Sequence, residues 1–156
     1  MKAERIASGD DSTHVLVFEK GDEAASLLRS YVRDERVSSG SISGIGAFER
    51  ARLGFFDWTT KSYAEIPVEQ QTEVLSLTGD VASKDGEPEV HVHVVLGMAD
   101  GTTIGGHLME GTVRPTLEVV LVRSPGHIIR TIDAESGLPL IDLARSRGVS
   151  TTGRRT

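Results

Sequence analysis

The chain contains no cysteine, so disulfide bridges, thiolate metal ligands and thiol nucleophiles are all excluded. Any metal ion must therefore be held by nitrogen and oxygen atoms. Aromatic residues are also scarce, and no apolar run approaches the roughly 20 residues that a membrane-spanning helix needs. Residues 1–11 mix charged and small side chains and lack the apolar segment of a secretory signal. We therefore expect a cytoplasmic protein with no membrane partner.

Positive charge is in deficit as well. With 17 Lys and Arg residues against 23 Asp and Glu residues, the formal net charge is −6. This balance disfavours the phosphate contacts on which nucleic-acid binding largely depends. A length of 156 residues with 38% hydrophobic residues suits one domain, which we expect at residues 1–146. Residues 147–156, mainly Ser, Thr, Gly and Arg, are predicted to be a flexible basic tail.

Hydrophobic periodicity predicts one main helix and a series of short strands. Apolar residues recur at three- and four-residue spacing between residues 24 and 35, with Asp22 as the expected N-cap. The strands are expected at residues 14–19, 40–48, 50–57, 62–68, 72–83, 88–98, 102–109 and 116–123, with a shorter one at 127–132 and a last short helix at 140–146. The predicted fold class is α+β, a single domain in which one main helix packs on a twisted, mostly antiparallel sheet of about seven strands.

Three histidines are predicted to meet on this sheet. In the strand at 88–98, the two-residue repeat puts His91 and His93 on the same side, with their Cα atoms about 7 Å apart. Asp100 and Gly101 indicate a tight turn that lays the next strand antiparallel to this one. Pairing residue 96 with residue 104 then sets His93 opposite His107. All three imidazoles come within reach of one metal ion.

The residues around these histidines leave the chemistry open. Gly105 and Gly106 lack side chains, which allows a ligand, a metal-bound water or another backbone to come close. A single strand histidine is more often a half-buried residue that bonds to its neighbours, as we expect for His14 and His127, but three on adjacent strands favour a metal. Three histidines with an open fourth position also occur in catalytic zinc sites, so the pattern does not separate catalysis from binding.

Two carboxylates are expected either to hydrogen-bond the metal ligands and hold them in place or to transfer protons. Glu73 interrupts an apolar pattern on the long strand at 72–83 and is the first choice, and Glu110 is the second. An ordinary exposed strand glutamate is an equally good interpretation of each.

Five segments of the chain resemble the plant-and-prokaryote conserved (PPC) domain, which also occurs in plant AT-hook nuclear-localised proteins. They are residues 40–47, 53–57, 73–79, 91–97 (His-Val-His-Val-Val-Leu-Gly) and 105–108 (Gly-Gly-His-Leu), and residues 135–143 resemble the usual end of the domain. The resemblance implies an α/β fold with a central antiparallel sheet, a homotrimer, and a divalent metal site at His91, His93 and His107. We expect the metal to be zinc.

The resemblance also implies a function. Members of the family are described as proposed DNA-binding proteins, so DNA is an expected partner and a DNA-binding or regulatory module is the first hypothesis. The chain departs from plant members at residues 70–75 and has no Arg-Gly-Arg-Pro hook for the minor groove. A metal-dependent enzyme or a binder of a small-molecule ligand is the alternative, and a scaffold with a structural ion is the third possibility.

Overall fold

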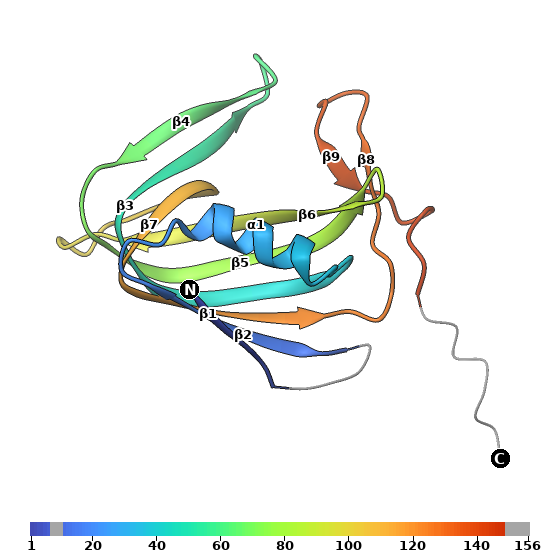
Figure 1. Cartoon of the computed structure of the whole chain (residues 1–156). Coiled ribbons are helices and arrows are strands. Elements are labelled where there is room, and N and C mark those ends of the chain that lie inside the picture. The colour runs from blue at the N-terminus through green and yellow to red at the C-terminus, as the bar shows by residue number, and fades with distance from the viewer. Residues whose placement is uncertain (7–10, 149–156) are drawn as a thin grey trace.

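The computed structural model describes residues 1–6 and 11–148. These residues form one helix, a seven-stranded sheet in the order β1-β2-β7-β6-β5-β3-β4 and a separate pair of strands, β8 and β9. The elements are β1 (Lys2–Arg5), β2 (Thr13–Glu19), α1 (Ala24–Asp34), β3 (Gly40–Asp57), β4 (Ser62–Val68), β5 (Thr72–Lys84), β6 (Glu87–Gly97), β7 (Thr103–Arg123), β8 (Arg130–Ile132) and β9 (Pro139–Ile141). Neighbouring strands of the sheet are antiparallel, so the predicted fold class is confirmed (Figure 1).

The hydrophobic core lies between α1 and one face of the sheet. Every second residue of β2 is buried, including Leu16 and Phe18, as expected for a strand with one face on a core. The helix buries Leu28 and Val32 against the sheet, which it crosses on one side (Figure 1). This face of the sheet is therefore closed, and the functional groups must lie on the other face or at the edges.

The N-cap of α1 is Glu23, not the predicted Asp22. The carboxylate of Glu23 accepts hydrogen bonds from two backbone N–H groups of the first turn and from that of Gly111 in β7. Asp22 instead accepts from the backbone N–H of Glu19. A longer side chain one residue later can thus cap the helix and tie it to the sheet at the same time.

In two places, a pair of strands predicted as separate forms one continuous long strand in the structure. β3 joins the two strands predicted between residues 40 and 57, and β7 joins those predicted between 102 and 123. Both strands change partners along their length, and β3 shifts register against β5 and β7. Such bulges bend a strand without ending it, although the hydrophobic repeat is interrupted there.

The short helix predicted at 140–146 is wrong. Pro139–Ile141 is a strand that pairs with β8, and Asp142 then accepts hydrogen bonds from the backbone N–H groups of Ala144 and Arg145. An aspartate that bonds locally in this way stabilises a turn at the expense of a helix.

The N-terminal end of the described chain differs from expectation. β1 was not predicted, because all four of its residues are exposed and show no hydrophobic repeat. Most of the tail predicted at 147–156 lies outside the described residues, but Arg147 pairs with His127 in an isolated bridge. Within the described part of the chain, no helix is long and apolar enough to cross a membrane.

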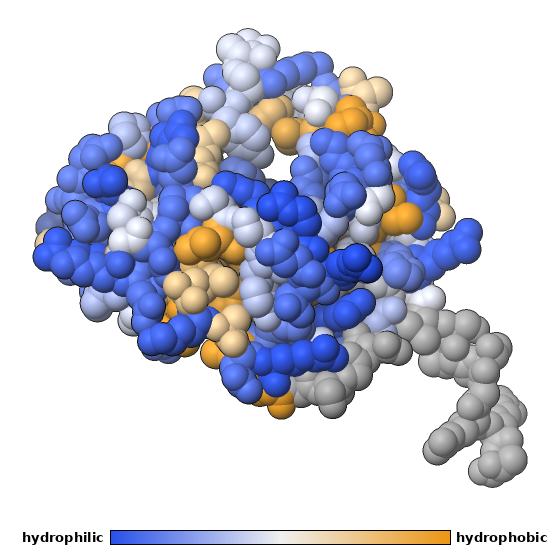
Figure 2. Space-filling model, in the orientation of Figure 1, coloured by the Kyte–Doolittle hydropathy of each residue, from blue (hydrophilic) through white to orange (hydrophobic). Residues whose placement is uncertain are grey.

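The two faces of the sheet differ in polarity. The side that carries α1 exposes mainly hydrophilic residues (Figure 2). The opposite face carries several apolar side chains at strand positions next to buried ones. These side chains are 38% to 62% exposed. We call them the outer-face patch: Ile45, Leu75, Val95, Val120 and Val122.

Candidate metal centre

Three histidines meet where β6 and β7 part. The two strands pair only over the last residues of β6, with His93 opposite His107 and residue 96 opposite residue 104, which is the predicted register. His91 projects from the same side of β6 as His93. The ring centroids of the three residues are 4.9, 5.2 and 5.6 Å apart. The clustering predicted from the sequence is therefore confirmed.

The ring nitrogens are close enough to share one ion. The Nε2 atoms of His91 and His93 are 3.1 Å apart, and one nitrogen from each of the three rings lies within 4.8 Å of the others. Nitrogens bound to a tetrahedral zinc ion at about 2.0–2.1 Å lie about 3.3–3.4 Å from each other. The buried Nδ1 of His107 has no hydrogen-bond partner. The spacing and the donor atoms thus fit a divalent ion such as zinc.

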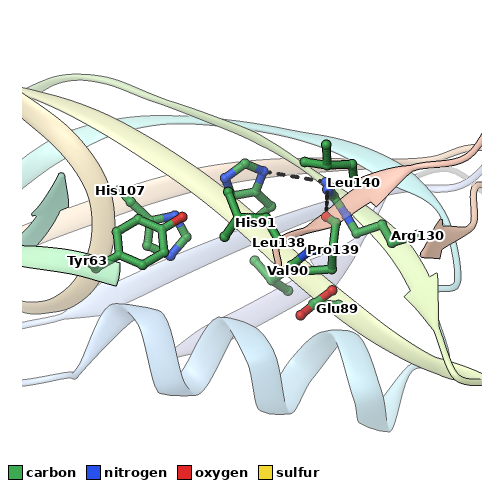
Figure 3. Close-up of a pocket in the computed structure, with 9 residues that line it drawn as sticks. All are labelled: Tyr63, Glu89, Val90, His91, His107, Arg130, Leu138, Pro139 and Leu140. Carbon is green, nitrogen blue, oxygen red and sulfur yellow. Dashed lines mark hydrogen bonds between the residues drawn. The ribbon is translucent and has the colours of Figure 1, made fainter. Parts of the chain in front are cut away.

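Tyr63 of β4 closes one side of the cluster. Its ring lies against that of His107, with the centroids 5.0 Å apart (Figure 3). Burial, together with the neighbouring His91 and His93, lowers the pKa of His107 to about 4. The ring of His107 is therefore neutral at pH 7, and neutral imidazole is the form that binds a metal.

Arg130 of β8 lies on the other side of His91 (Figure 3). Its Nη2 donates to Asp80 at 2.6 Å and lies 3.5 Å from Nδ1 of His91, while its Nη1 donates to the carbonyl oxygen of Pro139. Asp80 is opposite His91 in the ladder of β5 and β6. Burial, followed by the charge of Arg130, lowers the pKa of His91. The guanidinium thus favours a neutral ring at His91.

Glycines allow the strands to approach closely here. A Cβ atom on Gly106 would lie 2.9 Å from the carbonyl oxygen of Gly54 in β3, and one on Gly105 would lie 3.0 Å from that of Val94. Close backbone approach was one of the predicted reasons for the two glycines before His107.

Neither predicted carboxylate lies beside the histidines. Glu73 is exposed and pairs with Gly97, four residues along β6 from His93, which is a separation of about 13 Å at the usual strand rise. Glu110 is 55% exposed and forms an ion pair with Arg52 of β3. The structure does not bring either glutamate into the cluster.

The groups that do surround the histidines were not predicted. They are Tyr63, Asp80, Glu89 and Arg130. Asp80 offered a weak signal, because aspartate is depleted in strands and this one lies inside the strand predicted at 72–83. Arg130 reaches the site only through the packing of β8 beside β5, which no local pattern reveals.

Comparisons with known proteins agree with this fold. The model of the Plants and Prokaryotes Conserved (PCC) domain family matches residues 5–125. A proposed DNA-binding protein of Bacteroides thetaiotaomicron has 27% sequence identity and a TM-score of 0.84, over 92% of this chain and 99% of that one.

Two archaeal structures are also similar. A metal-containing protein of Archaeoglobus fulgidus has 31% identity and a TM-score of 0.77, over 90% of this chain and 99% of the other. A plant- and prokaryote-conserved (PPC) protein of Pyrococcus horikoshii has 33% identity and a TM-score of 0.77, over 88% and 97% of the two chains.

Longer relatives exist among curated proteins. Two bifunctional GlmU proteins of Synechococcus strains are 28% and 31% identical over 76% and 67% of this chain. The chain spans only 18% and 16% of their lengths.

Proposed function

Because this chain belongs to the Plants and Prokaryotes Conserved domain family, we propose that it is a metal-binding protein in which His91, His93 and His107 hold one divalent ion. The observation that carries the proposal is the convergence of three ring nitrogens within 4.8 Å of one another. Zinc suits three neutral imidazole ligands without cysteine. The similar archaeal protein that is described as metal-containing supports the proposal.

The chain itself prepares this site for a cation. The lowered pKa values of His91 and His107 keep both rings unprotonated at neutral pH. A divalent ion with three protein ligands would have a fourth coordination position free for a water molecule or another ligand, and it would act there as a Lewis acid. The direct test is metal analysis of protein purified without a histidine tag. A preparation with no stoichiometric divalent metal, even after incubation with zinc, would contradict the proposal.

Acidification is expected to release the ion. Protons compete with the metal for the imidazole nitrogens, and the ordinary histidine pKa is about 6.5. Because the pKa of His107 is lowered to about 4 and that of His91 is also lowered, competition at these rings begins below the ordinary range. We therefore expect the metal to be largely retained at pH 6.5 and to be lost progressively as the pH falls towards about 4. Metal content after dialysis across this range is the measurement, and full occupancy below pH 4 would argue against histidine ligands.

The lowered pKa of His107 also contributes to the pH dependence of the stability of the metal-free protein. The unfolded chain binds a proton at His107 near its ordinary pKa of about 6.5, whereas the folded chain binds it only near 4. Stability that is present above pH 6.5 is therefore lost as the pH falls through this window.

We further propose that the chain forms a homotrimer through the outer-face patch. Its five apolar residues lie on four strands, and three of them, Ile45, Leu75 and Val120, line one shallow hollow. Contiguous exposed apolar surface of this kind usually marks a protein interface. A second and a third copy of the chain are the partners that the family resemblance favours.

DNA binding is the second candidate function. The similar Bacteroides protein, which is described as a proposed DNA-binding protein, favours it. The charge opposes it, because a trimer of chains with a net charge of −6 would carry −18. Binding would therefore need a local cluster of arginines, such as the exposed Arg145 and Arg147 and those that follow them in the sequence.

A salt-dependent mobility-shift assay tests this function. If the chain binds DNA, we expect a complex at low ionic strength whose affinity falls steeply with added salt, because phosphate contacts release counterions. Removal of residues 149–156 should weaken the complex if the tail arginines take part. The absence of any complex at low salt would exclude DNA as a direct partner.

A further inference from the structure

A pocket lies beside the histidines, at the edge of the sheet. β6 has no partner from β7 before His93, and the β3–β4 hairpin and the β8–β9 hairpin flank this open edge (Figure 1). The space between them is a cavity of about 250 Å³, which we call the edge pocket. Tyr63, Glu89, His91, His107 and Arg130 supply its polar lining (Figure 3). Its volume suits a small metabolite better than a drug-sized ligand.

The edge pocket gathers unpaired polar atoms. In the described part of the chain, four buried side-chain polar atoms lack a hydrogen-bond partner, and three of them belong to residues that line this pocket. They are Oε2 of Glu89, Nδ1 of His107 and Nε of Arg130. Buried polar atoms are rarely left unpaired, because the loss of water is then uncompensated. Nδ1 of His107 is a possible donor to the metal ion, so the atoms left for a ligand of this pocket are Nε of Arg130, which needs an acceptor, and Oε2 of Glu89, which needs a donor.

Arg130 is held in place as an anion-binding group. Its side chain is only 5% exposed, and its bonds to Asp80 and to the carbonyl oxygen of Pro139 fix the plane of the guanidinium. The Nε–H group remains without a partner. The free Nε–H group can therefore donate a charge-assisted hydrogen bond to one oxygen of a carboxylate, while the other donors stay engaged.

The charge of the pocket depends on the metal. Without an ion, the carboxylates of Asp80 and Glu89 exceed the single positive charge of Arg130. With a divalent cation at the three neutral histidines, positive charge exceeds negative charge by one unit. An anion should consequently bind to the metal-loaded protein and be excluded from the metal-free one.

We infer that the edge pocket binds a small carboxylate that also carries a hydroxyl group. The carboxylate contacts Arg130 next to the metal centre, and the hydroxyl group donates a hydrogen bond to Oε2 of Glu89. The apolar residues Val90, Leu138 and Leu140 line the remaining wall and suit a short aliphatic portion. This inference rests on the metal centre proposed above, since the ion supplies the excess positive charge.

The experiment is calorimetric titration of the zinc-loaded full chain with L-lactate. Propionate, which lacks the hydroxyl group, and lactamide, which lacks the charge, are the matched probes. We expect lactate to bind about tenfold or more tightly than propionate, because propionate leaves Oε2 of Glu89 unpaired. Lactamide should not bind detectably, because it lacks the negative charge that Arg130 and the ion attract. Lactate should bind the chelator-treated protein at least about tenfold more weakly.

Two variants test the named contacts. Glu89→Leu should reduce the preference for lactate over propionate to about one, whereas Glu87→Leu, an exposed position two residues earlier on β6, should keep it. Arg130→Lys should weaken both acids about tenfold. Because Arg130 is buried, the result for this variant is interpreted only if the protein is folded and retains zinc. If it does not, the Glu89 variant and the three probes alone test the pocket assignment.

The outcomes separate the two proposals. A protein that retains zinc but binds lactate no better than lactamide would overturn the pocket assignment alone, as would an unchanged lactate preference in Glu89→Leu. A protein that cannot retain zinc would overturn the metal centre and the pocket assignment with it.

Discussion

Replacing His107 with alanine is expected to lower zinc affinity at least about 100-fold. Loss of a group that merely supports a metal ligand already costs about 10- to 100-fold, and His107→Ala removes one of three direct ligands. The two histidines of β6 would remain, but they would fill only two of the four coordination positions of a tetrahedral ion and leave the other two to water. The measurement is a zinc titration against a competing chelator, with circular dichroism to verify the fold.

His127→Ala is the matched control. His127 is exposed and lies outside the cluster, so its removal should leave zinc affinity unchanged. A folded His107→Ala protein that binds zinc as tightly as the unaltered chain would show that the three-histidine centre is wrong.

If the chain forms the proposed trimer, Ile45→Lys is expected to convert it to monomers at micromolar concentration. Ile45 is 62% exposed in the single chain, so a lysine there should cost little in the folding of one subunit. In the trimer the same lysine would be buried against a neighbour, and an unpaired buried charge costs several kcal/mol. The measurement is the molar mass in solution by light scattering or sedimentation.

Ile132→Lys provides a comparison at similar exposure. Ile132 of β8 is 57% exposed but lies away from the outer-face patch, so this variant should keep the mass of the unaltered protein. If Ile45→Lys is still trimeric, the outer-face patch is not the interface. If the unaltered chain is already a monomer, the trimer itself is ruled out.

Local patterns were enough to predict the histidine cluster. The strand repeat fixes which side of β6 carries His91 and His93, and the turn at residues 100–101 is short enough to set the register with β7. All three histidines lie within one hairpin, so no knowledge of the rest of the fold is needed. The main helix was predictable for the same reason, since its apolar face repeats within eleven residues.

The surroundings of the cluster depend on contacts between distant segments. Arg130 reaches His91 because β8 packs beside β5, and Tyr63 reaches His107 because β4 folds back along β3. Neither residue stands out in its own segment. Glu73 was predicted to support the metal ligands because it stands out in its own segment. The register of β5 and β6, however, places it beside Gly97 and away from the histidines. The sequence therefore predicted the histidine cluster better than the groups around it.

The hairpin that carries Tyr63 has a bearing on how a ligand could enter. β4 is the last strand of the sheet, it pairs only with β3, and only Val68 of its seven residues is fully buried. Edge elements with so little buried surface open at low free energy, whereas strands that are paired on both sides do not. We therefore expect the tyrosine side of the cavity to open more readily than the rest of the sheet, which would admit a ligand to the histidines without unfolding of the core.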